Sequence, residues 1–341
     1  MLKIGLIGLG FMGRTHFENY IRLEKEGLPI KLVALCDIDK TKFEDNKVTG
    51  NLDVGKGNYD FSNYKLYFDY VKMIEEEELD IIDISLPTYL HADAAIKALD
   101  KGINVLCEKP MALNSDECSK MIEASLRNNK KLMIAQCLRF WPAYEYLKEC
   151  VEDKRFGNVV SAYFFRGGST PLWSYQNWLL DETKSGGCLL DQHIHDIDIV
   201  NWLFGKPQYV STIAKKIMQG SGYDAISTNY IYSDSKVINA QDDWTLNGDF
   251  GFDMIFRVNF ERGNIVFEKG KLKVNPNDQQ GFYPELDKDN GYYREIRYFI
   301  ESILNNTVLE KANPYSTMDS IKIAEAEKES ADKNGLFVEV K

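Results

Sequence analysis

The stretch Lys3-Ile-Gly-Leu-Ile-Gly8-Leu-Gly10-Phe-Met-Gly13 decides the fold of the first part of the chain. It joins a short apolar run to three glycines at the spacing GxGxxG, and the helix-like residues 14–26 follow. A second apolar run at residues 31–37 ends on an acid. A strand, a glycine-rich turn, a helix and a second strand of these lengths are typical of a dinucleotide-binding unit.

If a dinucleotide binds at this turn, each of the three glycines has a structural role. Gly8 and Gly10 let the backbone approach a pyrophosphate at the N-terminus of the helix, and Gly13 permits the helix to pack closely on the strand. A plain glycine-rich turn is the alternative. The position of the turn, between a strand and a helix, favours the dinucleotide site.

Asp37, the acid that ends the second strand, indicates which dinucleotide would bind. Its carboxylate can accept hydrogen bonds from the ribose hydroxyls and would repel a 2′-phosphate. No arginine follows it in Asp37-Ile-Asp39-Lys40. The sequence therefore favours NAD over NADP, a preference that Lys40 and Lys42 keep moderate.

Strand-like and helix-like segments alternate up to about residue 138, which predicts a parallel, doubly wound sheet. Residues 44–63 are polar and predict a surface loop. We expect strands at residues 81–86, 104–107 and 131–138, and helices at residues 69–78, 90–101 and 115–129. Ligands bind at the carboxyl ends of such strands. The residues expected there are Gly8, Asp37, Pro87, Glu108 and Gln136.

The pattern then changes to that of an antiparallel sheet with flanking helices. We expect helices at residues 142–152, 292–304 and 317–334, and strands at residues 159–165, 209–218, 227–232, 244–247, 252–261, 264–269, 271–274 and 336–340. The chain is therefore predicted to be an α/β protein of two domains. The expected domains are residues 1–128, which bind the dinucleotide, and residues 129–341.

Two of the four histidines stand in the stretch 184–198, directly after Gly186-Gly187. The glycines predict a turn that opens a helix running to Phe204. On that helix Asp191 and His195 share one face, because they are four residues apart. A carboxylate beside an imidazole is the usual way to hold a proton acceptor that works near neutral pH. A helix N-terminus with favourable acids and a capped histidine is the alternative.

The segment Cys107-Glu108-Lys109-Pro110 ends another expected strand. Pro110 cannot continue a ladder and fixes the backbone after Lys109. Lys109 is therefore expected at the strand end, where a nicotinamide ring would lie. A surface lysine at a turn is the alternative.

The overall composition excludes several classes of protein. The 341 residues include 52 acidic and 41 basic side chains, a net charge of −11, which argues against a general nucleic-acid binder. The six cysteines are scattered and contain no CxxC pair, so we expect reduced thiols and no metal site. We find no signal-peptide pattern and no apolar run of membrane-spanning length, and expect a cytoplasmic protein without membrane contact.

These motifs together resemble the Gfo/Idh/MocA oxidoreductases, the relatives of glucose–fructose oxidoreductase and inositol dehydrogenase. The matching segments are Gly8-Leu-Gly10-Phe-Met-Gly13-Arg-Thr-His16, Pro87-Thr-Tyr-Leu-His91, Glu108-Lys109-Pro110, and Ser-Gly186-Gly187 with Asp191 and His195. The resemblance implies a Rossmann domain and an α/β domain with a large, open, mostly antiparallel sheet, which serves as a homodimer surface, often within homotetramers. It also implies NAD(P)-dependent oxidation or reduction at a carbinol carbon of a sugar, a cyclitol or a related polyol.

The resemblance also implies roles for single residues. The catalytic lysine, aspartate and histidine of the family fall on Lys109, Asp191 and His195. The expected cofactor contacts are Gly8, Gly10, Phe11, Met12, Gly13, Asp37, Leu86, Pro87, His91, Glu108, Lys109 and Gln136. The expected substrate contacts are Lys109, Arg166, Trp173, Asp191, His195 and Tyr292, the last at the start of a late Tyr-x-x-Glu helix.

Two departures from the family pattern occur near the candidate acid–base pair. Many members have three glycines where this chain has Gly186-Gly187-Cys188, so the turn is expected to differ slightly. Many have Gly or Asn where this chain has Gln192-His193. We expect His193 to face outward, with a second polar substrate contact as the alternative.

Two other functions fit the same motifs. One is an NAD-dependent glycosidase that oxidises a sugar transiently and accumulates no NADH. The other is a sugar and NAD sensor without chemistry. Such sensors tend to lose the lysine or the histidine, and Lys109 and His195 are both present.

Overall fold

The computed structural model describes residues 1–44 and 59–341. The chain forms two compact units. The first contains Met1–Cys137 and Tyr292–Met318, and the second contains Leu138–Gly291 and Asp319–Lys341. The expected boundary between residues 128 and 129 falls inside the first unit, which also takes up a late helix. Most of the loop expected at residues 44–63 lies outside the described residues.

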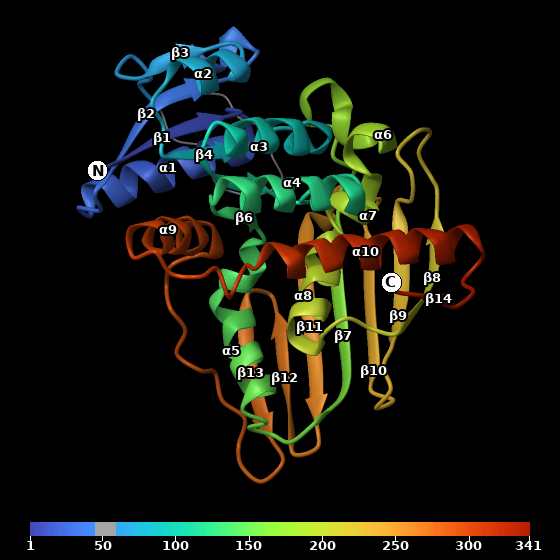
Figure 1. The fold of residues 1–341 in the computed structure, drawn as a ribbon. Coiled ribbons are helices and arrows are strands. Elements are labelled where there is room, and N and C mark those ends of the chain that lie inside the picture. Colours follow the sequence, from blue (N-terminus) through green and yellow to red (C-terminus); the bar gives the residue numbers. More distant parts are fainter. Residues whose placement is uncertain (45–58) are drawn as a thin grey trace. The chain divides into compact units, whose positions relative to one another are not determined.

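The first unit is built on a parallel sheet of six strands in the order β3-β2-β1-β4-β5-β6 (Figure 1). Its strands are β1 (Leu2–Ile7), β2 (Ile30–Cys36), β3 (Lys65–Tyr67), β4 (Ile81–Ile84), β5 (Asn104–Glu108) and β6 (Leu132–Ala135). Every residue of β4 and β6 is buried, which explains why these strands are apolar apart from Asp83 of β4. The expected parallel sheet is confirmed.

Helices and short helical turns connect these strands. The α-helices are α1 (Phe11–Lys25), α2 (Tyr70–Glu76), α3 (His91–Asp100) and α4 (Ser115–Asn128), and the 3₁₀ turns are η1 (Lys40–Phe43) and η2 (Thr88–Leu90). A further 3₁₀ turn, η3 (Cys137–Phe140), follows β6 where the first unit ends. The strand order reverses between β1 and β4, so the carboxyl ends of these two strands form the switch point at which such sheets bind ligands.

Helix α9 (Gly291–Leu304) belongs to the first unit although it comes late in the chain. Tyr293 on α9 donates a hydrogen bond to Glu26, and the guanidinium of Arg22 lies 3.8 Å from the centre of the Tyr293 ring. These contacts join α9 to the end of α1. The first unit is therefore assembled from two separate stretches of sequence.

The second unit contains a mixed sheet of eight strands in the order β13-β12-β11-β7-β10-β9-β8-β14. Its strands are β7 (Val159–Gly168), β8 (Tyr209–Lys215), β9 (Ala225–Ile231), β10 (Val237–Asp243), β11 (Phe252–Phe260), β12 (Gly263–Glu268), β13 (Lys271–Pro276) and β14 (Val338–Glu339). Only the β7–β10 pair is parallel among the described strands of this sheet. The expected large, mostly antiparallel sheet is confirmed.

One face of this sheet is covered by helices (Figure 1). The helical segments of the second unit that follow η3 are α5 (Pro142–Glu152), η4 (Tyr175–Leu180), α6 (Glu182–Ser185), α7 (Gly187–Asp191), α8 (Ile194–Phe204), η5 (Gly248–Phe250) and most of α10 (Pro314–Asp332). Burial alternates along the strands: Ile226, Thr228 and Tyr230 of β9 are buried, whereas the residues between them are at least partly exposed. The helices therefore cover one face and leave the other open within the unit.

The expected strand at residues 244–247 is wrong, and the actual strand lies just before it, at β10. Two of the inward-facing residues of β10 are Ile238 and Ala240, but the third is Asp242, so the apolar alternation is interrupted. Trp244 is buried beyond the strand end, where its indole Nε1 donates a 2.7 Å hydrogen bond to Oδ1 of Asp224. The apolar side chain of Trp244 therefore suggested a strand at residues 244–247, after the true strand had ended.

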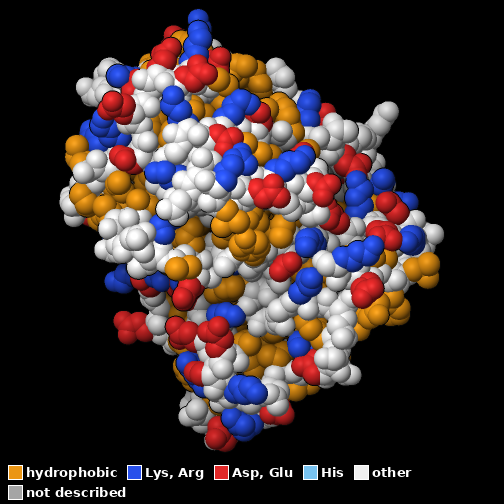
Figure 2. Space-filling view, in the orientation of Figure 1, with side chains coloured by type: hydrophobic (Ala, Val, Ile, Leu, Met, Phe, Trp, Pro, Cys, Tyr) orange, Lys and Arg blue, Asp and Glu red, His pale blue; other side chains and the backbone are white. Residues whose placement is uncertain are grey.

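No helix within the described ranges 1–44 and 59–341 combines the length and the apolar character that crossing a membrane requires. On the face drawn in Figure 2, acidic and basic side chains are interspersed among hydrophobic ones.

Candidate active site

The glycine turn after β1 has the geometry that a pyrophosphate cradle requires. Gly8 has a φ of +92°, and a Cβ there would lie 2.3 Å from the carbonyl oxygen of Ser85. A Cβ at Gly13 would lie 1.8 Å from the carbonyl oxygen of Gly8. Around Gly10 no described atom lies within 4 Å of the corresponding position. Gly8 and Gly13 are thus demanded by packing, while Gly10 leaves space at the N-terminus of α1 for a ligand. The residues present fit a dinucleotide.

Asp37 directly follows β2 and is fixed by two backbone amides. Its Oδ2 accepts a hydrogen bond of 2.8 Å from the N–H of Leu9, and its Oδ1 accepts one of 2.8 Å from Asp39. Burial raises the pKa of Asp37 above its ordinary value, although these amides and Lys42 oppose the shift. The carboxylate is therefore tied to the glycine turn, where the adenosine ribose of a bound dinucleotide would lie.

Arg14, in the first turns of α1, does not supply a free cation beside Asp37. Its side chain is buried and donates to the carbonyl oxygens of Leu9 at 3.3 Å and Lys42 at 2.8 Å. The guanidinium carbon also lies 5.5 Å from the centre of the Tyr59 ring. Arg14 thus joins the glycine turn to η1, a role that the sequence did not indicate.

His91, an expected cofactor contact, is buried between two segments that form the site. Its Nε2 lies 2.7 Å from the carbonyl oxygen of Leu86 and its Nδ1 lies 2.8 Å from that of Pro110. Burial lowers the pKa of this imidazole below its ordinary value. These contacts support a positioning role, in which His91 joins the segment after β4 to the segment after β5.

Glu108 and Lys109 stand where β5 ends. Oε2 of Glu108 accepts a hydrogen bond of 2.9 Å from the backbone N–H of Lys109, and Oε1 of Glu108 forms an ion pair of 3.2 Å with Nε2 of His16. The Lys109 side chain is half-buried, and its peptide bond to Pro110 is cis. Gln136 is buried directly after β6. By sheet topology, these residues share one edge with Gly8 and Asp37.

A buried cluster of ionisable side chains contacts Glu108 through His16. Nδ1 of His16 lies 2.8 Å from Oδ2 of Asp83, and the Tyr20 hydroxyl donates to the same oxygen at 2.7 Å. The carboxyl group of Glu295, on α9, is fully buried beside them. This cluster was not predicted from the sequence, although two signals of it were present: the acid inside the apolar run Ile-Ile-Asp83-Ile and His16 in the glycine motif.

The charges of this cluster follow from its geometry. Burial alone would lower the pKa of His16, but Asp83 and Glu108 outweigh it and raise that pKa well above the ordinary value. Burial alone would raise the pKa of Glu108, but His16 and Lys109 hold it below the ordinary value. Burial, together with the charges of Glu108 and Asp83, raises the pKa of Glu295 well above the ordinary value. The surroundings therefore favour the charged form of His16 and the protonated form of Glu295.

In the second unit, Asp191 and His195 lie on two helices rather than one. Helix α7 ends at Asp191 and α8 begins at Ile194. The N–H of His193 donates to the carbonyl oxygen of Cys188, five residues back, at 2.8 Å, so the chain widens into a turn at Gln192 and His193. The expected continuous helix is wrong here. Asp191 and His195 are both half-buried and flank the turn.

The expectation that His193 faces outward is wrong. The side chain is fully buried, and its ring forms ion pairs with Asp242 and Glu327. Arg166, an expected substrate contact, is also buried, and its Nε donates to Oδ2 of Asp196 at 3.0 Å. The pattern could not reveal these pairs, because the partners come from distant parts of the sequence.

Asp198, three residues after His195, has a structural partner. Its two oxygens accept hydrogen bonds of 2.7 Å from Nε and from one terminal nitrogen of Arg139. The Ser320 hydroxyl donates to the same carboxylate at 2.8 Å. Trp173 is half-exposed ahead of η4, whereas Tyr292 is buried at the start of α9, in the first unit.

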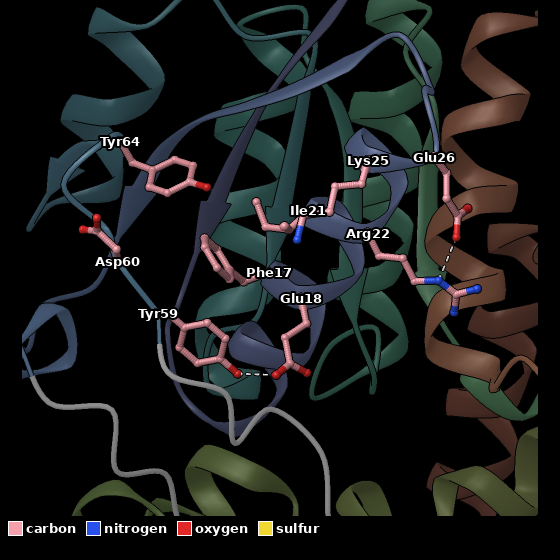
Figure 3. A pocket seen from close by; sticks show the side chains of 9 residues that line it. All are labelled: Phe17, Glu18, Ile21, Arg22, Lys25, Glu26, Tyr59, Asp60 and Tyr64. Atoms are coloured by element: carbon pink, nitrogen blue, oxygen red, sulfur yellow. Dashed lines mark hydrogen bonds and ion pairs between the residues drawn. The ribbon is translucent and has the colours of Figure 1, made fainter.

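A separate hollow of about 680 Å³ opens on the outer side of α1 (Figure 3). Figure 3 shows Arg22 turned toward Glu26 and Tyr59 turned toward Glu18. Nε of Arg22 lies 2.8 Å from Oε1 of Glu26, and the Tyr59 hydroxyl donates a hydrogen bond to Glu18. The residues that line this hollow come from the middle and the end of α1 and from residues 59–64. They do not include the strand ends that carry Asp37 and Lys109. We therefore do not assign the hollow to the candidate active site.

Nothing in the described residues suggests a bound metal ion. No cluster of three or more His, Cys, Asp or Glu side chains there has an arrangement suited to a metal, and all six cysteines are buried free thiols.

Two family models match the chain. The model described as the oxidoreductase family with an NAD-binding Rossmann fold matches residues 2–136, and that of the GFO/IDH/MocA C-terminal domain matches residues 144–266. The first match spans all strands of the parallel sheet, and the second spans β7 to β11 and most of β12 but not β13 or β14.

Similar curated proteins include an inositol 2-dehydrogenase from Salmonella typhimurium, 27% identical over 208 residues, which are 60% of this chain and 55% of that protein. A levoglucosan dehydrogenase from Pseudarthrobacter phenanthrenivorans is 29% identical over 67% of this chain and 58% of its own length. A 2,7-anhydro-N-acetylneuraminate hydratase from Mediterraneibacter gnavus is 29% identical over 67% of this chain and 59% of its own length. The chain thus spans little more than half the length of these relatives.

Solved structures share the fold over the whole chain. An oxidoreductase from Thermotoga maritima is 22% identical with a TM-score of 0.83, and the match covers 99% of this chain and 98% of the other. A levoglucosan dehydrogenase in complex with NADH and levoglucosan is 21% identical with a TM-score of 0.85, covering 99% of both chains. At this level of identity the likeness establishes the fold.

Proposed function

Because the chain belongs to the Gfo/Idh/MocA oxidoreductase family, we propose that it is an NAD-dependent enzyme acting on a sugar, an inositol or a related polyol. It would transfer a hydride between a carbinol carbon of the substrate and the nicotinamide. The observation that carries the proposal is the edge of the parallel sheet in the first unit. The glycine turn, Asp37 and Lys109 all follow strands that end at this edge.

The cofactor would be held by the residues at that edge. Gly8, Gly10 and the N-terminus of α1 would receive the pyrophosphate, and Asp37 would bind the ribose hydroxyls of the adenosine half. Because Asp37 is a carboxylate and the nearby Arg14 is buried in contacts with backbone carbonyls, the site favours NAD over NADP. Glu108 would lie near the nicotinamide ribose. The other expected cofactor contacts are Phe11, Met12, Gly13, Leu86, Pro87, His91 and Gln136.

The side chains would divide the remaining chemistry among them. The bound nicotinamide supplies the hydride acceptor. His195 would take the proton from the substrate hydroxyl, and Asp191 would orient the imidazole or hold a neighbouring hydroxyl. Lys109 would donate a hydrogen bond to the reacting oxygen and stabilise its developing negative charge.

Substrate contacts beyond these groups would come from aromatic side chains. Trp173 is half-exposed and could stack on the face of a sugar ring, and Tyr292 could contribute its hydroxyl. Arg166 is committed to Asp196, so a substrate contact by Arg166 requires that pair to rearrange.

A reaction without net oxidation or reduction is the second candidate function, and the name of one relative supports it. A relative at 29% identity carries the name of a hydratase rather than a dehydrogenase. An enzyme that oxidises its substrate transiently, such as an NAD-dependent glycosidase, returns its cofactor to the starting state. Such an enzyme would consume substrate without accumulating NADH. A sensor without chemistry would bind NAD and convert no substrate.

The test is a panel of aldoses, inositols, anhydrosugars and uronic sugars, with NADH absorbance and substrate loss measured in parallel. We expect NADH to accumulate with at least one polyol. His195→Ala and Lys109→Met should each lower kcat by about two to four orders of magnitude. Lys206→Ala, an exposed residue just after α8, is the matched control and should leave kcat unchanged. Full turnover by His195→Ala would refute the assignment of the base.

A further inference from the structure

The turn between α7 and α8 is held by its own backbone and by one buried side chain. The N–H of His193 donates to Cys188 of α7 at 2.8 Å, and its carbonyl oxygen accepts from the N–H groups of Asp196 and Ile197 of α8 at 3.0 Å each. His193 therefore takes part in the hydrogen bonding of both helices. Asp191 and His195, the candidate acid–base residues, stand two positions to either side of it.

The imidazole of His193 joins this turn to two distant elements. Its Nδ1 lies 2.5 Å from Oδ2 of Asp242 on β10, and its Nε2 lies 3.0 Å from Oε2 of Glu327 on α10. All three side chains have no exposed surface. Gln192 adds a contact to a third element, since its Nε2 donates to the carbonyl oxygen of Arg166 on β7 at 3.3 Å. The turn is thus fixed from three directions.

The charges around His193 require it to be a cation. The buried charged side chains packed there are two bases, Arg166 and His193, and three acids, Asp196, Asp242 and Glu327. The hydroxyl of Tyr230 and the thiol of Cys188 are buried beside the same carboxylates. A neutral imidazole would leave Asp242 and Glu327 as buried carboxylates without a cation between them, which is strongly unfavourable. Burial alone would lower the pKa of His193, but Asp242 and Glu327 outweigh it and raise that pKa well above the ordinary value.

Packing alone does not account for this arrangement. Leu190 and Ile194 already bury apolar side chains on either side of the turn. A well-packed apolar residue at position 193 would avoid the desolvation of three charged groups, and such replacements are often neutral or stabilising. Apolar contacts are non-directional, whereas an imidazolium between two carboxylates fixes both the position and the orientation of the ring. The cluster therefore provides directional anchoring.

We propose that His193 is a positioning residue for the reaction: as a cation between Asp242 and Glu327, it fixes the turn and thereby the orientation of Asp191 and His195. The proposal rests on the proposed function, because it assigns those two residues to the chemistry. His193 itself is buried and does not contact the substrate.

The test uses three variants of the full-length protein. His193→Gln removes the cation and leaves two unbalanced carboxylates, so it should lose stability as well as activity. The double variant His193→Gln/Glu327→Gln removes one charge of each sign and keeps the net charge of the cluster. Thr212→Val, which removes the 2.9 Å hydrogen bond between two buried threonine hydroxyls in the same sheet, controls for a general loss of stability.

We expect the double variant to fold and to bind NADH with a Kd within about twofold of the wild type, because its changes lie outside the proposed cofactor site. Its kcat should fall by about 10- to 100-fold, the effect of misplacing catalytic groups by about 1 Å. The Thr212→Val variant should keep its kcat. A double variant that retains kcat within twofold of the wild type would overturn the proposal.

A second readout separates this proposal from the proposed function. The chain has four histidines, so the imidazole signal of His195 can be assigned by NMR and followed through a pH titration. We expect the pKa of His195 to differ between the wild type and the double variant, because the carboxylate of Asp191 would move relative to the ring. Identical titration curves would overturn the positioning role. Failure to convert any polyol, with a shifted His195 titration, would overturn only the proposed function.

Discussion

Nε2 of His16 lies 3.2 Å from Oε1 of Glu108, and Nδ1 of the same ring lies 2.8 Å from Asp83. One buried cation on α1 thus holds the ends of β4 and β5 together. Since the other oxygen of Glu108 accepts the backbone N–H of Lys109, the position of Lys109 depends on a residue that has no exposed surface.

Loss of the His16 cation should destabilise the first unit strongly. We expect His16→Gln to lower the free energy of unfolding by about 3–5 kcal/mol, the usual result of leaving buried carboxylates without their partner. Urea denaturation measures this change. In the double variant His16→Gln/Asp83→Asn, part of the loss should be recovered, and a double variant less stable than the sum of the single changes would contradict the ion-pair account.

The pH dependence of that stability has a definite sign. The pKa of His16 is raised well above the ordinary 6.5 in the folded protein, so its stabilisation is fully present below pH 6.5 and is lost as the pH rises through the folded value. The wild type should therefore lose more stability than His16→Gln between about pH 7 and pH 9. Thermal unfolding at several pH values checks this difference.

Asp37 should control the choice between NAD and NADP. Asp37→Asn keeps an oxygen that can accept the N–H of Leu9 but removes the negative charge. We expect the ratio of kcat/KM for NAD to kcat/KM for NADP to fall about tenfold or more, because a 2′-phosphate is no longer repelled. Asp39→Asn, whose carboxylate caps η1 through the N–H of Thr41 at 3.0 Å, is the control. If the ratio changed equally in both variants, Asp37 would not be the residue that distinguishes the ribose of NAD from that of NADP.

Glu295 should make the protein less stable as the pH rises. The pKa of its carboxyl group is raised well above the ordinary 4.5 by burial and by the neighbouring acids. The resulting stabilisation is fully present below pH 4.5 and is lost as the pH rises through the folded value. Glu295→Gln should therefore gain in Tm relative to the wild type as the pH increases from about 6 to 9. Glu301→Gln, on the partly exposed side of the same helix, should show a constant difference.

The open face of the large sheet should form the homo-oligomer interface. Ile255 of β11 lies directly opposite Phe165 of β7, and the next pair on this face joins Arg257 to Tyr163, with 5.1 Å between the guanidinium carbon and the ring centre. A glutamate at position 255 would place a charge among these residues. We expect Ile255→Glu to lower the molar mass in multi-angle light scattering to that of one chain, while Leu126→Glu, at an exposed position on α4, leaves it unchanged. A wild-type protein that is already a single chain would refute this interface.

The sequence predicted the first unit well because most of its strands are largely buried and give short apolar runs. The run before Gly8 is of this kind, and the run Ile81-Ile-Asp83-Ile is buried throughout although Asp83 interrupts its apolar sequence. Strand β10 was misplaced because its third inward residue is Asp242, the partner of His193. When an inward-facing position of a strand holds a polar residue that pairs with a distant side chain, the alternation of apolar and polar residues that predicts the strand is lost.

The candidate site was predictable where its residues follow strand ends, and not where it depends on contacts between distant segments. Lys109 and Asp37 could be located from the alternation of strands and helices. The break between α7 and α8 could not, since it depends on contacts from His193 to residues on β10 and α10. The support of Glu108 by His16 likewise becomes visible only when α1 is packed against β4 and β5.

The return of α9 to the first unit bears on how these enzymes can be recombined. A chimera made by a single crossover near residue 137 would leave the donor's nucleotide-binding half facing a foreign copy of this helix. The contacts of Glu26 and Arg22 with Tyr293, and the burial of Glu295 beside Asp83 and Glu108, would then depend on a helix from another protein. A functional exchange between relatives must therefore transplant residues 292–318 together with residues 1–137.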